Sequence, residues 1–213
     1  MMPVVFDLDG TLVDSLPGIA SAANRLLAEE GLSPLPQAQV GGFVGMGVDV
    51  FLDRLIAATA LDVQDRPRLS ERFLPIYEEE SKGTPLFEGV GDALRVLKAR
   101  GVPLGICTNK PSGPLQHVLA DIPEASLFDA VVAGDTLPLR KPDPAPLMLA
   151  FEKLGATRGL YVGDSETDAE TARRAGMPFA LFTRGIRLSP VEEIPHDVAF
   201  DDFAELEAIY DGF

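Results

Sequence analysis

Two aspartates, Asp7 and Asp9, directly follow a short apolar run, residues 4–6, near the start of the chain. A β-branched apolar run of this kind predicts a buried strand. In open α/β sheets, ligands bind beyond the carboxyl ends of the strands, where these two acids would lie. They could serve one site only if the chain turns between them, and Gly10 permits such a turn. A simple Asp-Gly turn would explain Asp9 and Gly10, but it leaves Asp7 without a neutralising partner.

Polar residues also follow two later apolar runs. Thr108 and Asn109 come after residues 104–107, and Asp164 and Asp168 come shortly after residues 160–162. Each pair has a plainer explanation. Thr108 and Asn109 could begin a turn, and Asp168 could complete a helix-capping box with a serine three residues before it.

Lys141 lies in a loop between these two runs, next to Pro142. A lysine in such a place is more often solvated than catalytic. If the strands are parallel, however, their carboxyl ends meet at one edge, and Lys141 could face the acids there. One lysine cannot balance several clustered carboxylates, so a divalent cation with oxygen ligands is expected, and Mg²⁺ fits such a set. Acids, Mg²⁺, a lysine and a hydroxyl donor suit phosphoryl transfer, although these residue types alone do not identify the aspartate that attacks.

The elements that must position these residues fall into two groups. After the first strand, helical periodicity continues through residues 16–83, with no run typical of a strand. From about residue 84 onward, short apolar runs alternate with helical patterns, which predicts βαβ units and a parallel sheet. We therefore expect an α/β core formed by residues 1–15 and 84–213, with residues 16–83 inserted as a helical domain. That insertion could act as a lid or could serve stability alone.

The composition excludes several classes of function. The 213 residues are 46% hydrophobic and 24% charged and carry a formal net charge of −15, which argues against nucleic acid and against anionic membranes as partners. The only cysteine, Cys107, lies in an apolar run, so we expect no disulfide and a reducing, cytoplasmic location. His117 and His196 lack the spacing of zinc ligands. No segment has the length of a membrane span or the pattern of a secretory signal.

Four stretches, in this order, resemble the motifs of the haloacid dehalogenase superfamily: residues 7–15, residues 108–110, Lys141 with Pro142, and residues 163–168. They are spread over nearly the whole chain, and their combination is far more specific than any one of them. The resemblance implies a Rossmann-like core, with residues 16–83 as the small α-helical cap of that superfamily.

The resemblance also implies roles in catalysis. Asp7 would be the nucleophile that forms an aspartyl-phosphate, and Asp9 would act as general acid and then as general base. Thr108 and Lys141 would bind the phosphoryl oxygens, and Asn109 would belong to the substrate-binding residues. The ligands of Mg²⁺ would be the Asp7 carboxylate, the main-chain carbonyl of Asp9, Asp164 and, nearby, Asp168, which could also orient Lys141.

Further residues restrict the range of possible substrates. Asp9 argues for phosphate chemistry rather than dehalogenation, and Lys82, the only lysine in residues 16–83, lies too near the end of that block to suit a phosphonate hydrolase. Residues 43–47, together with Arg54, resemble the bacterial phosphoglycolate phosphatases. Backbone amides near Gly45 and Gly47 could meet a small carboxylate and Arg54 could add charge, or these residues could simply form a helix connection and a solvated surface.

We therefore expect hydrolysis of a small phosphorylated metabolite, 2-phosphoglycolate, to glycolate and phosphate. A pyrophosphatase, a sugar-phosphate phosphatase and a phosphohexose mutase remain enzymatic alternatives. A receiver-like phospho-acceptor domain is the non-enzymatic alternative, although such domains lack a long helical insertion after the first strand. The sequence does not predict an oligomeric state.

Overall fold

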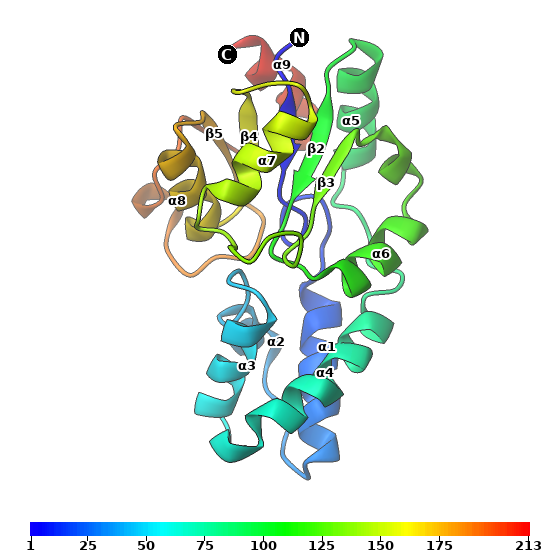
Figure 1. Cartoon of the computed structure of the whole chain (residues 1–213), viewed down its shortest axis with the longest axis vertical. Helices are drawn as coiled ribbons and strands as arrows, with labels where there is room; N and C mark the ends of the chain where they lie inside the picture. Colours follow the sequence, from blue (N-terminus) through cyan, green and yellow to red (C-terminus); the bar gives the residue numbers. More distant parts are fainter.

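A parallel sheet flanked by helices forms one end of the molecule, and a separate group of helices forms the other (Figure 1). The computed structural model describes all residues from 1 to 213. The strands are β1 (Val4–Phe6), β2 (Leu104–Cys107), β3 (Ala130–Val132), β4 (Leu160–Gly163), β5 (Phe179–Phe182) and β6 (Val198–Phe200). All are parallel, in the order β3-β2-β1-β4-β5-β6. The predicted α/β class with a parallel sheet is confirmed.

Helices occupy residues 16–83 and alternate with the strands in the rest of the chain, as predicted. They are α1 (Leu16–Glu29), α2 (Gln37–Gly41), α3 (Val48–Ala57), α4 (Arg66–Glu80), α5 (Val90–Ala99), α6 (Ser112–Asp121), α7 (Ala145–Lys153), α8 (Glu166–Ala175) and α9 (Leu206–Asp211). A short 3₁₀ turn, Phe203–Glu205, leads directly into α9. No helix combines the length and the apolar character needed to cross a bilayer.

β1 lies in the middle of the sheet and is completely buried. Its side chains alternate between the two faces, as expected for a strand: Val4 and Phe6 belong to one hydrophobic cluster and Val5 to another. The first cluster includes residues of α5 and α9, and the second includes residues of α7 and α8. This position explains why the run is apolar throughout, and it places the residue after β1, Asp7, at the centre of the carboxyl edge.

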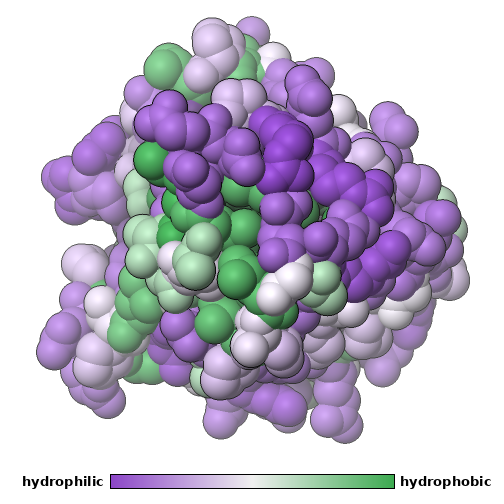
Figure 2. Space-filling view, turned by 90° about the horizontal axis from the view of Figure 1, so that it is seen from below, coloured by the Kyte–Doolittle hydropathy of each residue, from purple (hydrophilic) through white to green (hydrophobic).

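Helices α1 to α4 pack around a hydrophobic cluster of their own. Within it the rings of Phe51, Phe73 and Tyr77 form a stack, with successive centroids 5.2 and 5.6 Å apart. Seen from below, this end of the molecule shows apolar residues gathered near the centre and hydrophilic residues around them (Figure 2). The helices share few contacts with the sheet, so their packing supports a separate unit over residues 16–83; the exact domain limits stay a prediction.

Helix α1 begins without a side-chain cap. Ser15 lies at the N-cap position, before the first helical residue, and Pro17 lies in the first turn. The Ser15 side chain makes no capping hydrogen bond, however, and its hydroxyl oxygen is buried without a partner. Ser15 therefore marks the beginning of α1 by position and does not cap it.

Candidate active site

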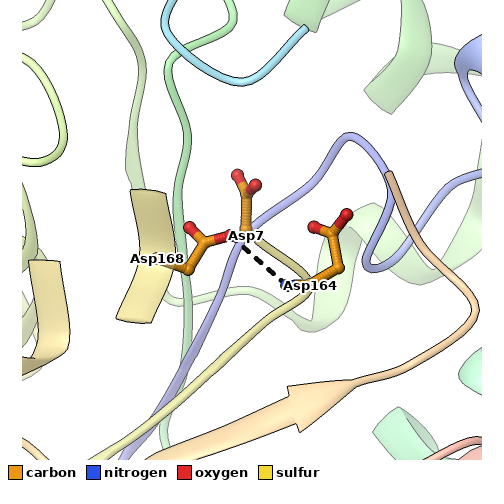
Figure 3. Close-up of side chains that lie close together, drawn as sticks. All are labelled: Asp7, Asp164 and Asp168. Carbon is orange, nitrogen blue, oxygen red and sulfur yellow. Dashed lines mark hydrogen bonds between the residues drawn. The ribbon is translucent and has the colours of Figure 1, made fainter. Parts of the chain in front are cut away.

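The carboxyl ends of β1 and β4 bring three acids together. Asp7 follows β1, Asp164 follows β4, and Asp168 lies in the first turn of α8. One carboxylate oxygen from each of the three lies within 4.8 Å of the other two, and all three residues are buried. Figure 3 shows their side chains around a shared space, with the main-chain N–H of Asp164 bonded to Asp168. Residues far apart in the sequence thus meet at one edge, because neighbouring parallel strands end there.

The loop after β1 is shaped to let these acids approach. Gly10 has a φ of +85°, a conformation that favours glycine. A Cβ atom at this position would lie 2.3 Å from Oδ2 of Asp164, so a side chain would collide with the acid. Gly185 lies equally close to Asp164 from the other side, where an added Cβ would be 2.3 Å from the Cβ of that acid. Glycine is therefore required here for space as well as for backbone conformation.

Asp164 is fixed by hydrogen bonds to both carboxylate oxygens. The Thr11 hydroxyl donates to Oδ1 over 2.7 Å, and the main-chain N–H of Ile186 donates to Oδ2 over 2.5 Å. Burial nevertheless raises the pKa of Asp164 well above its usual range, and the nearby Asp168 and Asp7 raise it further. A positive ligand in this space would reverse that effect.

The two carboxylate oxygens of Asp168 accept hydrogen bonds from different groups. Its Oδ2 accepts the Ser165 N–H and hydroxyl, and the Ser165 hydroxyl in turn accepts the Asp168 N–H, so the predicted capping box is present. Its Oδ1 accepts hydrogen bonds from the Lys141 ammonium and the Tyr161 hydroxyl, both over 2.7 Å. Burial alone would raise the pKa of Asp168, but Lys141 and these hydrogen bonds outweigh it and lower the pKa. Asp168 is therefore a fixed negative charge that orients Lys141.

Lys141 lies between Asp168 and Asp7. Its Nζ is 2.9 Å from Oδ1 of Asp7, and its side chain is only 2% exposed. Burial would lower the pKa of the ammonium, but Asp168 and Asp7 outweigh it and raise the pKa, so Lys141 stays charged. The Asp7 pKa is raised to about 7, chiefly by burial and also by Asp168 and Asp9, against the opposing effect of Lys141.

The donor set fits a hard divalent cation. Three buried carboxylates face one ammonium, which leaves two negative charges without balance if all three acids are ionised. Oδ1 of Asp7 is buried and accepts no hydrogen bond, because the nearby ammonium of Lys141 is not aligned to donate one. Clustered oxygen ligands of this kind suit Mg²⁺, which is bound through one or two carboxylates and shares the remaining positions with water or a phosphate. The carboxylate of Asp9 is not part of this group.

A small cavity lies beside the acids, between the sheet and the helical group. The volume in which the centre of a water molecule fits is about 50 Å³. One wall comes from the loops after β1 and β2: Asp7, Asp9, Thr108, Asn109, Lys110 and Pro111. The other wall comes from the helical group and is apolar or glycine apart from the Tyr77 hydroxyl: Ile19, Val44, Gly45, Gly47, Val48, Phe51, Phe73 and Tyr77.

The predicted substrate-binding residues differ in how the structure uses them. Thr108 lines the cavity, and its oxygen accepts the Lys110 N–H over 3.1 Å, which leaves the hydroxyl hydrogen for a ligand. Gly45 and Gly47 also line the cavity, with φ values of +109° and +86°. The side chain of Asn109 is fully engaged: its amide donates to the carbonyls of Gly45 and Lys141 and accepts the Lys141 N–H.

Arg54 is not brought to the cavity. Its guanidinium donates to the Gly42 carbonyl over 3.3 Å and contacts the Met46 sulfur at 3.5 Å. These contacts hold the loop that joins α2 to α3. The structure therefore assigns Arg54 a position outside the cavity wall, behind the loop that carries Gly45 and Gly47.

Two residues to which the sequence assigned no role complete the site. The Lys110 ammonium lies 3.1 and 3.4 Å from the two carboxylate oxygens of Asp9 and 2.6 Å from the hydroxyl of Tyr77. The side chain of Lys110 is only 1% exposed. Lys110 follows Thr108 and Asn109 directly, so its place in that motif was a usable signal. Nothing in the sequence marks Tyr77, which comes from α4.

Comparison with known proteins identifies the family that this chain resembles. A family model described as haloacid dehalogenase-like hydrolase matches residues 4–182. A phosphoglycolate phosphatase of Cereibacter sphaeroides is 47% identical over 209 residues, covering 97% of this chain and 96% of that protein. A phosphoglycolate phosphatase of Rhodospirillum rubrum is 44% identical and covers 95% of this chain and 88% of its own length. A crystal structure described as a predicted phosphoglycolate phosphatase from Haemophilus somnus superposes with a TM-score of 0.92 at 32% identity, covering 98% of this chain and 97% of that one.

Proposed function

The chain belongs to the haloacid dehalogenase-like hydrolases, and from this membership we propose that it is a Mg²⁺-dependent phosphatase that hydrolyses 2-phosphoglycolate to glycolate and phosphate. One observation carries the proposal. Oδ1 of Asp7 is buried, accepts no hydrogen bond and lies 2.9 Å from a buried ammonium, in a residue that lines a small cavity. A carboxylate in this state is suited to attack a phosphorus atom rather than to hold the fold together.

Asp7 acts as the nucleophile in this proposal. A carboxylate oxygen of Asp7 bonds to phosphorus while the bond from phosphorus to the glycolate oxygen breaks. Asp9, which borders the same cavity, gives its proton to the leaving oxygen and later takes a proton from the attacking water. That water releases phosphate and regenerates Asp7, so the difficult displacement is divided into two easier ones.

Three groups of this chain bind the phosphoryl oxygens. The Thr108 hydroxyl and the Lys141 ammonium provide two of them, and the ammonium is held in place by Asp168 over 2.7 Å. Because the Asn109 side chain is engaged elsewhere, its contribution is the main-chain N–H, which donates to no other protein group. Donors fixed before the reaction stabilise charge on the equatorial oxygens without reorganisation.

Asp7 and Asp164 would hold Mg²⁺, with the Asp9 carbonyl as a further ligand and Asp168 close by. Bound there, the ion would supply positive charge opposite the transferring phosphoryl group. This chain's residues do the rest: Thr11 and the Ile186 N–H fix Asp164, and Asp168 directs Lys141 toward Asp7.

Residues 16–83 serve as the cap in this proposal, over a core of residues 1–15 and 84–213. The cap supplies the apolar half of the cavity wall and brings the glycine loop, with Gly45 and Gly47, against the core through Asn109. In this proposal, main-chain amides of this loop would meet the carboxylate of 2-phosphoglycolate.

A phosphate-release assay tests the proposal. The purified protein is offered 2-phosphoglycolate, pyrophosphate and hexose phosphates, each with Mg²⁺ and again with excess chelator. We expect the highest kcat/KM for 2-phosphoglycolate, and loss of release in chelator that Mg²⁺ restores. A higher kcat/KM for pyrophosphate or a hexose phosphate would show that 2-phosphoglycolate is not the preferred substrate. Full activity in excess chelator would show that the reaction does not need Mg²⁺.

A further inference from the structure

Lys110 is the only cationic side chain on the wall of the cavity. The charged residues that line it are Asp7, Asp9 and Lys110. Lys141 is directed to Asp7 and Asp168 and does not border the cavity, and the helical group contributes no charged side chain to it. A substrate with a second negative charge, beyond its phosphate, therefore meets one side-chain cation that the mechanism has not yet used.

The ammonium of Lys110 is held in place at the cavity wall. Its main chain is fixed on both sides, because the N–H donates to Thr108 and the carbonyl accepts from Gly134. Its three N–H donors make one hydrogen bond of 2.6 Å to the Tyr77 hydroxyl and two longer ones, of 3.1 and 3.4 Å, to the oxygens of Asp9. The bond of 3.4 Å is the longest of the three, so its N–H is the donor that a ligand in the cavity would take. A buried ammonium is stable only among acceptors, so an anionic ligand beside it is favoured.

The contact between Lys110 and Asp9 indicates which part of the substrate lies next to the Lys110 ammonium. Asp9 is the proposed acid at the leaving oxygen, and Lys110 lies 3.1 Å from its carboxylate. In 2-phosphoglycolate a single methylene separates the leaving oxygen from the carboxylate carbon. The group next to Asp9 is therefore next to the carboxylate end of the bound substrate.

We infer that Lys110 binds the carboxylate of the substrate and thereby selects phosphorylated acids over neutral phosphomonoesters. This inference rests on the proposed function and adds the residue that decides specificity. Tyr77 keeps the ammonium in place, both through its hydroxyl and through its ring, whose centroid is 4.3 Å from Nζ.

The test compares two substrates in one variant. Lys110→Met keeps an unbranched apolar chain and removes its charge. The probes are 2-phosphoglycolate and 2-hydroxyethyl phosphate, which carries a neutral –CH₂OH in place of the carboxylate. We expect the ratio of kcat/KM for the two substrates to fall by roughly 10- to 100-fold in Lys110→Met, since a hydrogen bond between two charged groups is lost. Because both rates come from the same preparation, the ratio does not depend on how much of the variant is folded.

Lys82→Met is the matched control. Lys82 is exposed and forms no ion pair, and we expect its substitution to leave the ratio within about twofold of the wild-type value. An equal loss on both substrates in Lys110→Met would overturn the inference and leave Lys110 as a residue that only positions Asp9. No loss on either substrate would overturn it as well. A wild-type protein that does not hydrolyse 2-phosphoglycolate would instead refute the proposed function, so the two failures are distinguishable.

Discussion

The ammonium of Lys110, in the loop after β2, lies 2.6 Å from the hydroxyl of Tyr77, near the end of α4. The same ammonium is paired with Asp9, so a residue of the helical group is linked to the proposed general acid through a single side chain. The position of α4 therefore affects the position of Asp9. A small change on the helical side is expected to alter catalysis without any direct contact with the reacting atoms.

Tyr77→Phe tests this link. The substitution removes one acceptor from a buried ammonium, and we expect kcat/KM to fall about tenfold and the free energy of unfolding to fall by about 1–3 kcal/mol. Tyr210→Phe is the control, because Tyr210 is similarly buried and its hydroxyl donates to the Met2 carbonyl over 2.9 Å. It should lose stability and keep its kcat/KM. Wild-type kcat/KM in Tyr77→Phe, measured by phosphate release, would contradict the link.

Asp7→Asn should abolish phosphate release while the fold is retained. An amide cannot form the acyl-phosphate, so we expect kcat to fall by about 10³-fold or more. Circular dichroism checks that the structure is unchanged. The control is Asp201→Asn, since Asp201 is exposed and makes no hydrogen bond or ion pair, and it should retain near wild-type activity. Substantial turnover by Asp7→Asn would refute the nucleophile assignment.

The raised pKa of Asp7 predicts how stability depends on pH in the absence of metal. This pKa is raised from 3.8 to about 7, so between these values the folded state binds a proton that the unfolded state has lost. The contribution to stability is fully present below pH 3.8 and is lost as the pH rises through about 7. We therefore measure the melting temperature of Asp7→Asn minus that of the wild type, both in chelator. This difference should increase by several degrees as the pH rises from about 5 to about 8.

Mg²⁺ should change this relation in the opposite direction. The ion competes with the proton for Asp7, so it should raise the melting temperature of the wild type more at about pH 8 than at about pH 5.5. Asp7→Asn should respond less at both values. Equal stabilisation of the wild type at both pH values would show that Asp7 is not ionised by metal binding.

Gly10→Ala is expected to damage the metal site specifically. The added Cβ would lie 2.3 Å from Oδ2 of Asp164, so the acid must shift, and a shift of this size is expected to lower kcat/KM by about 10²-fold or more. Gly31→Ala is a matched control. Gly31 also has a positive φ, of +71°, but no atom lies within 4 Å of the place a Cβ would take, so it should lose only about 1–2 kcal/mol of stability. Similar activity in the two variants would show that the close approach at Gly10 does not matter.

The meeting of Asp7, Asp164 and Asp168 was predictable from the sequence for a simple physical reason. Buried strands read as short apolar runs, and parallel strands end at one edge, so the polar residues that follow them lie along that edge. Those that follow neighbouring strands, such as β1 and β4, meet there. The α/β class and the positions of most elements followed from the same patterns. The order of the strands did not, because it depends on which helices cover which face.

The residues on the cap side were much harder to predict. Arg54 was expected at the substrate, yet its guanidinium holds the loop at Gly42, and the Asn109 amide is occupied by Gly45 and Lys141. The contact between Lys110 and Tyr77 depends on how two separately packed units meet. Periodicity reports which face of a helix is buried, but it does not report what the other unit places opposite that face.

The Asn109 side chain has a practical consequence for anyone who wishes to redesign this protein. It touches Gly45 of the cap loop with one hydrogen bond and the backbone of Lys141 with two others. A substitution of Asn109 that changes the loop at Gly45 would therefore also release the backbone of Lys141 and disturb the position of its ammonium. Val48 lines the same space, is only partly buried and belongs to no ring stack, so new substrates are better sought by changing the volume of that side chain.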